Sequence, residues 1–311
     1  DTIGGRGGRV IRVTNRNDSG AGSFRDAVET QKGPRIVVFD VSGTIQLQSG
    51  ICICGEAASF LTVAGQTSPG GVQIKGAGLI AGDGGIYIGH GAHDVVIRYM
   101  RIRLGGPANY NTGAGLGLYS PQAPKSTYNI VFDHNSVEWA TDDSMSAYTG
   151  TDNITFQWNI VAESLPSMGM GGFDNSDSKI SVHHNLLAHG IYRNPSMGNV
   201  GVADWRNNIV YNWGNDNGAQ WGTYERNWST FGNFVNNHYI AGPNSQALAW
   251  MYLSNGGSTR LDGQSADRGG TKIYMQGNWT PACPTGCADD WSNNPKDLDY
   301  YLIGQPIPLA S

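Results

Sequence analysis

The sequence lacks the features that would direct it to a membrane or to nucleic acid. No stretch of the 311 residues approaches the run of about 18 apolar residues that a membrane-spanning helix needs. Charged residues make up only 14 %, and the net charge of −5 argues against the broad basic surface of a nucleic-acid binder. No G-x-x-x-x-G-K-S/T phosphate loop occurs, and the opening GGRGGR resembles one only loosely. We therefore expect no membrane, no nucleic acid and no organic cofactor among its partners.

Cysteine is scarce as well. The four cysteines form two tight pairs, Cys52 with Cys54 and Cys283 with Cys287. Neither pair has the two-residue gap that is usual in zinc ribbons. A local Cys283–Cys287 disulfide is expected within CPTGC, while a long-range bridge from the first pair stays open.

The chain opens at DTIGGRGG without a charged segment and an apolar run, so we expect that any secretory signal has been removed. Asn-x-Ser/Thr sequons, the acceptors for N-glycosylation, stand at Asn17, Asn153, Asn227 and Asn278. These features favour a secreted, extracellular glycoprotein, and we expect it to be a monomer.

Glycine and recurring asparagine turns are abundant instead. Glycine accounts for 45 residues, about twice its usual share of roughly 7 %. Short β-favouring segments such as NIVFDHNSV, NITFQWNIV and KISVHHNLL each end in a polar turn that contains asparagine. The equivalent asparagines stand 24, 26, 23 and 29 residues apart, at Asn135, Asn159, Asn185, Asn208 and Asn237. An irregular period of about 25 residues is typical of a solenoid.

These segments predict an all-β fold, a right-handed parallel β-helix that residues 1–311 form as a single domain. Each coil would contribute about three short strands, whose inward Val, Ile and Phe side chains stack on the next coil. Helical periodicity is scarce. The one candidate helix is SGAGSFRDAVET, with Ser23 at its N-terminus and Asp26 in place of the Glu of a capping box. We expect this helix, near residues 23–30, to cover the open end of the stack within an N-terminal cap at about 1–35. Further coils and a C-terminal extension would occupy about 215–311.

The stretch HHNLLAHGIYRNP, residues 183–195, concentrates three histidines and one arginine. Adjacent residues of a strand point to opposite faces, so the HHN motif is a poor zinc site. Because His134, His183 and Asn185 fall in the repeated strand-and-turn positions, we interpret them as residues of the scaffold.

Several of these stretches together resemble the pectate lyase family. The likeness covers residues 1 to about 215 and is carried by TIGGRGGRVIRVT, GSFRDAV, DVVIRYMRIRLG, NIVFDHNSVEWATDD, NITFQWNIVAESL, SVHHNLLAHGIYRNP and RNNIVYNWG. The resemblance implies a parallel β-helix. It also implies β-elimination within acidic, uronate-containing polysaccharide, usually assisted by calcium, so the expected partner is such a polysaccharide.

The resemblance singles out Arg193 as the central residue. The family places an arginine eight residues after the HHN motif in an Arg-x-Pro context, and Arg193 in RNP matches it. β-Elimination removes the proton at C5, beside the C6 carboxylate, so a cation must stabilise the developing carbanion. A guanidinium stays protonated, which conflicts with a role of Arg193 as the base. An equally physical role for Arg193 is to clamp the uronate carboxylate, with His184 or Tyr192 as the base. Glu163 and Arg206 are candidate substrate contacts.

The sequence departs from the calcium ligands that the resemblance implies. Asp142 matches an acidic ligand position, the second expected aspartate aligns with Ser146, and Asp143 could substitute through a shifted backbone. TGAGLGLYS offers no carboxylate on the preceding coil, the lysine expected after QWNIV is absent, and SMGN replaces a second arginine. We therefore predict that activity depends on Ca²⁺ only weakly or through Asp142 and Asp143.

Two other function classes stay open. A β-helix glycoside hydrolase needs two carboxylates about 5–9.5 Å apart. The chain offers enough acids for such a pair, namely Asp133, Glu138, Asp142, Asp143 and Glu163. A non-catalytic glycan-binding β-helix would suit the eroded ligand set and the 9 Trp and 14 Tyr residues. Formation of an unsaturated product separates a lyase from both.

Overall fold

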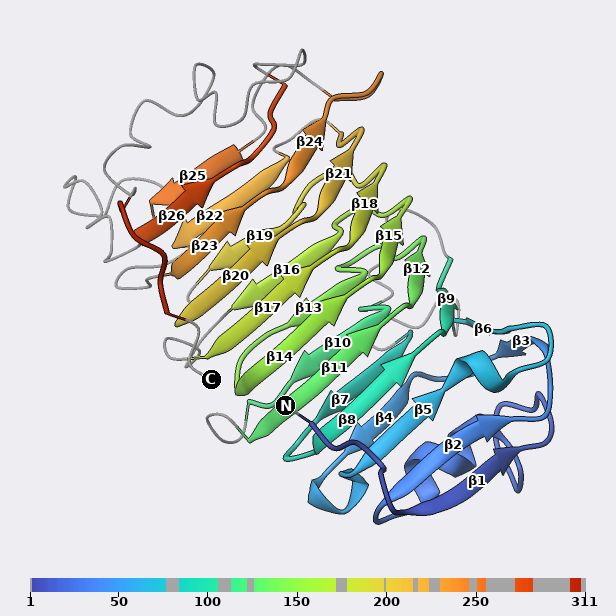
Figure 1. Cartoon of the computed structure of the whole chain (residues 1–311). Helices are drawn as coiled ribbons and strands as arrows, with labels where there is room; N and C mark the ends of the chain where they lie inside the picture. Colours follow the sequence, from blue (N-terminus) through green and yellow to red (C-terminus); the bar gives the residue numbers. More distant parts are fainter. Residues whose placement is uncertain are drawn as a thin grey trace, which may run out of the picture.

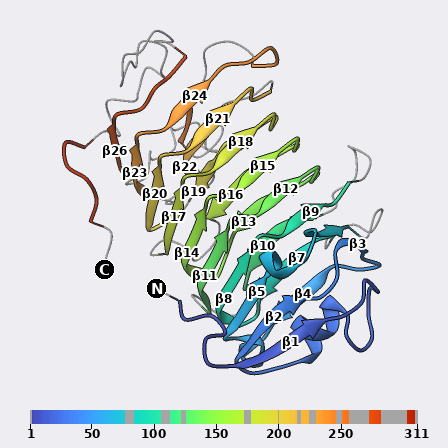
Figure 2. The ribbon, with the colours of Figure 1, turned by 45° about the vertical axis from the view of Figure 1, so that its right-hand side comes forward.

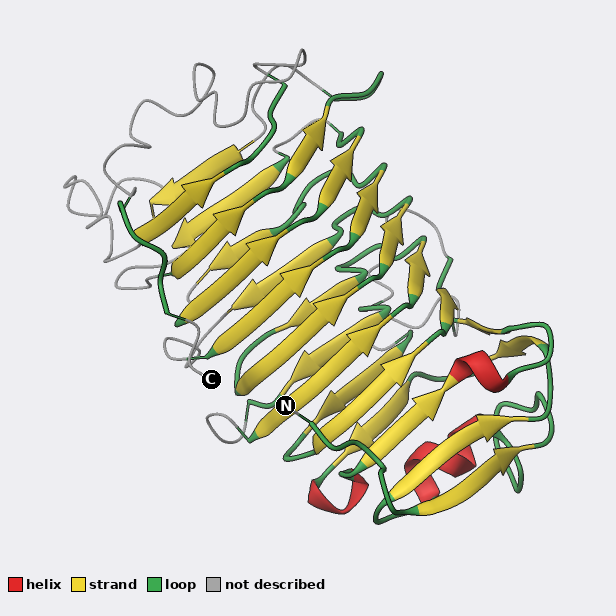
Figure 3. Ribbon diagram, viewed as in Figure 1, coloured by secondary structure: helices red, strands yellow, loops and turns green. Residues whose placement is uncertain are grey.

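In a computed structural model, the chain coils through three parallel sheets, A, B and C (Figures 1 and 3). The structure describes residues 2–76, 84–105, 113–121, 126–171, 178–198, 200–214, 218–223, 230–245, 251–255, 272–281 and 303–308. Each full coil takes one strand in sheet A, then one in B, then one in C, before the chain returns to sheet A one step further along. The predicted parallel β-helix is confirmed.

Sheet A is the longest of the three. Its ten described strands, in spatial order, are β1 (Arg9–Val13), β2 (Arg35–Phe39), β5 (Leu61–Ala64), β8 (His93–Arg98), β11 (Thr127–Asp133), β14 (Thr151–Gln157), β17 (Lys179–His183), β20 (Val202–Arg206), β23 (Phe231–Val235) and β26 (Lys272–Gln276).

Sheets B and C have eight described strands each. Sheet B consists of β3 (Gly43–Gln46), β6 (Val72–Lys75), β9 (Arg101–Arg103), β12 (Ser136–Glu138), β15 (Ile160–Ala162), β18 (Leu186–Ala188), β21 (Ile209–Tyr211) and β24 (His238–Ile240). Sheet C consists of β4 (Ile51–Cys54), β7 (Ile86–Gly89), β10 (Leu116–Tyr119), β13 (Met145–Ala147), β16 (Met168–Gly171), β19 (Ser196–Gly198), β22 (Ala219–Thr223) and β25 (Met251–Asn255). Figure 2 shows the strands of successive coils lying side by side.

The core is built from columns of inward side chains, one from each coil. One column in sheet A has fully buried members at Ile97, Phe132, Phe156, Val182, Trp205 and Phe234. The rings of Phe132 and Phe156 lie 5.2 Å apart, within the range of favourable aromatic pairs. Each such side chain contributes about 1.5–3 kcal/mol through burial, so the stack is stabilised along its whole length.

Buried asparagines tie the coils together at the turn from sheet A to sheet B. The Oδ1 atom of Asn159 accepts the backbone N–H of Asn135 at 2.8 Å and its side-chain Nδ2 at 3.1 Å. The same pair of bonds repeats between each later ladder residue and the next, along Asn159, Asn185, Asn208, Asn237 and Asn278. The five asparagines that the sequence places in equivalent turns thus form one hydrogen-bonded ladder. Its last member, Asn278, was not predicted, because 41 residues separate it from Asn237.

The predicted cap is also present. Residues 24–30 form a short helix whose last part is η1 (Asp26–Thr30), and Ser23 Oγ accepts the N–H of Asp26 at 3.1 Å. Phe24, Ala27 and Val28 are buried in the end of the core.

Arg35 completes this cap from inside. It is fully buried, and its guanidinium donates to the carbonyls of Ala27 at 3.1 Å and Val28 at 2.9 Å, near the end of the helix. Burial lowers the pKa of Arg35 to about 10, so the side chain stays charged at neutral pH.

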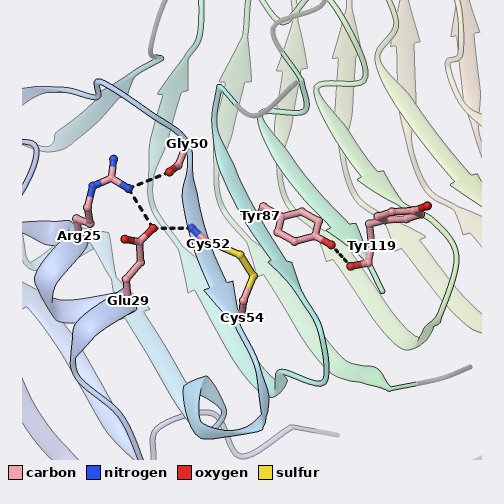
Figure 4. Close-up of a disulfide and its surroundings, with 7 residues drawn as sticks. All are labelled: Arg25, Glu29, Gly50, Cys52, Cys54, Tyr87 and Tyr119. Carbon is pink, nitrogen blue, oxygen red and sulfur yellow. Dashed lines mark hydrogen bonds and ion pairs between the residues drawn. A yellow bond between two sulfur atoms is a disulfide. The ribbon is translucent and has the colours of Figure 1, made fainter. Parts of the chain in front are cut away.

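The first cysteine pair does not form a long-range bridge. Cys52 and Cys54 are bonded to each other on β4, since residues two apart on a strand point to the same face (Figure 4). Cys283 and Cys287 lie outside the described residues, as does the sequon at Asn227. Of the other sequons, Asn17 and Asn153 are exposed, whereas Asn278 is fully buried in the ladder and cannot carry a glycan in the folded protein. None of the helices within the described ranges is long and apolar enough to cross a membrane.

We expect Asn185→Ala to lower the free energy of unfolding by about 2–4 kcal/mol, because it leaves buried partners unpaired on the preceding coil. The backbone N–H and Nδ2 of Asn159 lose their acceptor, and the carbonyl of Phe156 loses its donor. Urea unfolding measures the change.

The matched control is Asn236→Gly. Asn236 precedes a ladder residue, is exposed, and has φ = 53°, which glycine adopts readily. Equal losses in the two variants would show that the ladder does not carry the stability assigned to it.

Candidate active site on the outer face of sheet C

The outer face of sheet C has a floor of small side chains. One row of neighbours crosses β7, β10, β13, β16 and β19 at Tyr87, Gly117, Ser146, Gly169 and Ser196. Because residues alternate along each strand, the flanking Met145 and Met168 point into the core and are fully buried. Glycine and serine therefore leave space directly above the sheet.

A groove of about 270 Å³ occupies part of this space. Tyr87 and Tyr119 line one part of it, and Asp142, Asp143 and Tyr148 line another. Figure 4 shows Tyr87 and Tyr119 beside the Cys52–Cys54 disulfide, with the hydroxyl of Tyr87 bonded to the carbonyl of Tyr119. The groove thus joins aromatic side chains to a pair of carboxylates.

Arg193 is held beside this groove by two of its lining residues, Asp143 and Tyr148, which come from an earlier coil. Asp143 precedes β13, whereas Arg193 precedes β19, two strands further along sheet C. The Nη1 atom of Arg193 donates to Asp143 Oδ1 at 3.1 Å, to Asp143 Oδ2 at 3.2 Å and to Tyr148 Oη at 3.2 Å. Tyr148 in turn donates a short hydrogen bond to Asp143 Oδ2. We call Arg193, Asp143 and Tyr148 the guanidinium cluster.

Gly169 makes this cluster sterically feasible. It lies on β16, between the strands that carry the two halves of the cluster. A Cβ at this position would overlap with both Tyr148 Oη and Asp143 Oδ2. The missing side chain therefore lets the carboxylate and the phenol lie flat over the intervening strand.

Asp143 is nearly inaccessible to solvent, while Arg193 can be reached. The side chain of Asp143 is 2 % exposed and that of Arg193 is 28 % exposed. Burial raises the pKa of Asp143 above its usual value, and the positive charge of Arg193 and the hydrogen bond from Tyr148 only partly oppose this effect. The charged form of Asp143 therefore depends on both partners.

The structure brings four of the predicted site residues together. Asp142 Oδ1 lies 3.8 Å from Arg193 Nη1, next to Asp143 in the chain. The guanidinium carbon of Arg193 lies 5.4 Å from the centre of the Tyr192 ring, in cation–π contact. Four predicted residues thus lie together at the N-terminal ends of strands in sheet C: Arg193, Tyr192, Asp142 and Asp143.

His184 lies elsewhere, in the turn from sheet A to sheet B. Its ring stacks on Trp158 at 4.4 Å, and Trp158 continues the stack to His134 at 6.0 Å. The Nδ1 atoms of His183 and His184 lie 2.9 Å apart. Burial, together with the nearby His184, lowers the pKa of His183. The arrangement agrees with a scaffold role for these histidines.

Arg206 and Glu163 are not part of the cluster either. Arg206 ends β20 in sheet A and makes a two-pronged ion pair with the buried Asp204. Glu163 follows β15 with φ = 51°, and its backbone N–H bonds to Ala188 at 3.1 Å. It stands in the same kind of turn as Arg193, but within the described part of the chain its side chain makes no contact with the cluster.

Two members of the site were missed in the sequence. Tyr148 carries a signal that was available: Met145 and Ala147 alternate inward along β13, which places Ser146 and Tyr148 on the outer face. Gly169 has none, because its role depends on side chains from other coils that cross it.

The residues present do not fit a calcium ion at Asp142 and Asp143. Calcium binds six to eight oxygens, but both oxygens of Asp143 are already taken by Arg193 and Tyr148. Over the ranges that the structure describes, no three His, Cys, Asp or Glu side chains group as metal ligands. A metal here would have to displace the guanidinium.

Two of the five acids proposed for a glycosidase pair, Asp133 and Glu138, lie on other sheets and are occupied, whereas Asp142 and Asp143 lie together at the groove with Asp143 bonded to Arg193 and Tyr148. Asp133 on sheet A is bonded to Arg98, His134 and Gln157. Glu138 on sheet B pairs with Arg103 at 2.8 Å. Because one acid of a catalytic pair must donate a proton and the other must face the same bond, this arrangement does not favour a hydrolase.

Comparison with known proteins agrees with the fold and with the sequence resemblance. No family model matches the chain. The chain is 36 % identical to probable pectate lyase C of Neosartorya fischeri over 251 residues, 80 % of this chain and 54 % of that protein. It therefore spans about half the length of the curated relatives it matches.

Solved structures show the same architecture. Pectate lyase II from Xanthomonas campestris superposes with a TM-score of 0.55 at 16 % identity, covering 99 % of this chain and 89 % of that one. A pectate lyase from Bacillus sp. N165, solved in complex with trigalacturonate, superposes with a TM-score of 0.53 at 18 % identity, covering 93 % and 87 %. In sequence the chain is thus similar to pectate lyases over 80 % of its length, and it shares the fold of solved pectate lyases.

Proposed function

We propose that the protein cleaves uronate-containing, pectate-like polysaccharide by β-elimination in the groove over sheet C. The observation that carries the proposal is the guanidinium cluster: a partly exposed arginine, fixed by a buried carboxylate, beside a floor of small side chains. The names of the curated relatives and the trigalacturonate in the Bacillus complex support the same substrate class.

The reaction needs a cation near the C6 carboxylate of the uronate. Removing the C5 proton places further negative charge on a group that is already an anion, so the carbanion is stabilised only where positive charge is preorganised. Arg193 supplies such a charge, and its planar guanidinium suits the two oxygens of a carboxylate. The bond to O4 then breaks, and the leaving oxygen takes a proton.

Arg193 acts in this proposal as the cation rather than as the base. A guanidinium stays protonated in proteins, and the carboxylate of Asp143 at 3.1 Å further favours its charged form. Of the two predicted bases, Tyr192 lies beside the guanidinium, whereas His184 is engaged in a stack in the turn before sheet B. Tyr192 is therefore the better placed of the two.

Asp143 and Tyr148 act as positioning residues. An exposed arginine samples many rotamers, and ordering it for each substrate would cost free energy. Three hydrogen bonds to Nη1 fix the guanidinium before substrate arrives. Protonation of Asp143 would weaken the two bonds from Arg193, so the site should work only while Asp143 is ionised.

We further propose that the cation of this site is Arg193 in place of Ca²⁺, and that the protein acts outside the cell. The first point is supported by the oxygens of Asp143, which serve Arg193 and Tyr148. The second is supported by the Cys52–Cys54 disulfide, since disulfides persist mainly in oxidising compartments.

Replacing Arg193 tests the central claim. We expect Arg193→Ala to lower kcat on polygalacturonate on the order of a hundred- to thousandfold, the usual effect of losing one preorganised electrostatic donor. Arg193→Lys should also be severely impaired, because it keeps the charge but loses the planar fork. Ultraviolet absorbance of unsaturated uronides measures turnover.

Arg101→Ala is the matched control for these variants, since Arg101 is exposed on the outer face of sheet B. Thermal unfolding confirms that each variant is folded. A folded Arg193→Ala variant with near-normal kcat would exclude Arg193 from the chemistry.

Tyr148→Phe tests the positioning role through pH. The raised pKa of Asp143 predicts that kcat falls as pH falls through that value, because the protonated acid releases Arg193. Tyr148 stabilises the charged carboxylate, so its removal should raise the pKa of Asp143 further. We therefore expect the acid limb of the kcat profile to move to higher pH.

The control for this shift is Tyr274→Phe, which removes a phenolic hydroxyl that donates a hydrogen bond to Gln276 on sheet A. If Tyr148 had a purely structural role, Tyr148→Phe would lower kcat at every pH and leave the acid limb in place. That outcome would contradict the proposal.

Chelation tests the nature of the cation. Because Arg193 is bonded to Asp143, we expect dialysis against a chelator to change kcat by less than about twofold. Added Ca²⁺ should restore little of any lost activity, since a site with so few free oxygens binds Ca²⁺ poorly. Strong rescue by Ca²⁺ in wild type would contradict this. Loss of that rescue in Asp142→Asn/Asp143→Asn would then assign the metal to these two residues.

A further inference from the structure

A second groove lies on the outer face of sheet A, away from the guanidinium cluster. Its volume is about 1,210 Å³, and it extends over β8, β11 and β14 to Lys179 at the start of β17. It shares no lining residue with the groove over sheet C. The two grooves belong to different sheets of the coil and so open on different faces of the molecule.

The N-terminal segment forms one boundary of this groove. Gly5 donates its N–H to Thr62 Oγ1 at 2.9 Å, and Thr2 Oγ1 donates to Asp94 Oδ1 at 3.1 Å. Gly4 has φ = +53°, and a Cβ there would meet Thr62 and Val96. The N-terminal segment therefore packs closely against β5 and β8, where Figure 1 shows it crossing sheet A.

The segment near the C-terminus lies across the other end of the same sheet. Ile307 and Asn233 exchange two hydrogen bonds, of 2.8 Å and 3.0 Å, and Ile303 bonds to Ile273 at 3.0 Å. This segment covers β23 and β26, as Figure 1 shows. The outer faces of β11 and β14 thus lie between two transverse segments of the chain.

The floor of the groove is rigid and polar. Val131, Thr155 and Gln157 rise from β11 and β14. Gln157 Nε2 donates to the buried Asp133 at 3.0 Å, so the floor is tied to the scaffold. The amides of Asn129 and Asn153 are bonded to each other above the sheet. Such a surface offers hydroxyl and amide partners to a sugar, beside the apolar side chains of Val96 and Val131 and the ring of Tyr128.

Positive charge at the margins selects an acidic ligand. Arg6 and Lys179 are exposed, and neither forms an ion pair with any residue that the structure describes. The charge of Arg98 is matched by Asp133 at 2.6 Å, and Asp152 accepts the backbone N–H of Lys179 at 2.8 Å. The lining therefore has three cations, Arg6, Arg98 and Lys179, against two carboxylates, and this excess of one positive charge in a chain of net charge −5 favours a carboxylate-bearing ligand.

We propose that this groove is a second, non-catalytic binding site for a uronate-containing oligosaccharide; its ligand class rests on the proposed function. Its volume exceeds the roughly 300–1,000 Å³ of a typical small-molecule site, as a chain of several sugars requires. A polymer held on sheet A keeps other segments of the same polymer near sheet C, which raises their effective concentration at the active site.

Binding is measured in the Arg193→Ala background, so that no ligand is consumed. Isothermal titration with hexagalacturonate gives the Kd. We expect Arg6→Glu/Lys179→Glu to weaken binding at least about tenfold, because two attractive charges become repulsive. Lys75→Glu, the same change on the outer face of sheet B, is the control and should leave the Kd within about twofold.

A covalent probe locates the ligand. A water-soluble carbodiimide couples a uronate carboxylate of hexagalacturonate to a nearby lysine amine, and peptide mapping identifies the lysine. We expect the adduct at Lys179 in excess over Lys75, and we expect neutral cellohexaose not to compete. An unchanged Kd in Arg6→Glu/Lys179→Glu, equal labelling of the two lysines, or competition by cellohexaose would each overturn the proposal.

The outcome is separable from that of the proposed function. Turnover is measured on wild type by the release of unsaturated uronides, whereas binding is measured on a variant that lacks Arg193. Absence of unsaturated product together with charge-dependent binding at Lys179 would refute β-elimination and leave the second site standing. The opposite pattern would refute only the second site.

Discussion

The asparagine ladder is the interaction on which the rest of the architecture depends. Each Oδ1 accepts two bonds from the coil before it, so a buried amide is satisfied only when neighbouring coils meet in one register. A shift by one residue would expose the Phe132–Phe156 column and bury polar side chains, because inward and outward positions alternate along a strand. The ladder thus determines which residues form the core and which form the outer faces. The number of residues between two successive ladder asparagines can vary. Asn237 and Asn278 make the same bonds as the others although 41 residues separate them.

The ladder also explains the positions of His134 and His184. The residue before each ladder asparagine turns the chain with a positive φ, as in His134, Trp158 and His184 at 57°, 55° and 58°. Their rings then project outward from successive coils and stack on one another. A ring in this stack has neighbours on its faces, so it offers mainly its edge to a ligand. His184 is therefore poorly suited to reach a sugar bound over sheet C.

How much could be read from the sequence depends on how local the determining contacts are. The strands, the ladder from Asn135 to Asn237 and the cap at Ser23 follow from periodicity and short-range hydrogen bonding, and the structure agrees with them. The partners of Arg193 could not be read in this way, because 50 residues separate it from Asp143 and 45 from Tyr148. Arg193 lies near Asp143 and Tyr148 only because turns that are two coils apart lead into neighbouring parts of sheet C. Asn278 and the space over Gly169 were missed for the same reason: insertions of different length hide which positions become neighbours.

The guanidinium cluster and a calcium site compete for the same oxygens. A metal bound to Asp142 and Asp143 would need the carboxylates free, whereas an arginine held ready for substrate needs them engaged. In this chain Gly117 and Ser146 put no carboxylate on the floor of sheet C, and Gly169 leaves room for Tyr148 to lie over Asp143. Among the described residues the site has two acids, one of them buried and of raised pKa, and these alone would lack the charge and oxygens that bind a divalent ion. One guanidinium balances one buried carboxylate without further ligands. In the proposed mechanism, glycine and serine on the outer face of sheet C and the ion pair between Arg193 and Asp143 therefore both favour an arginine-centred site over a metal-centred one.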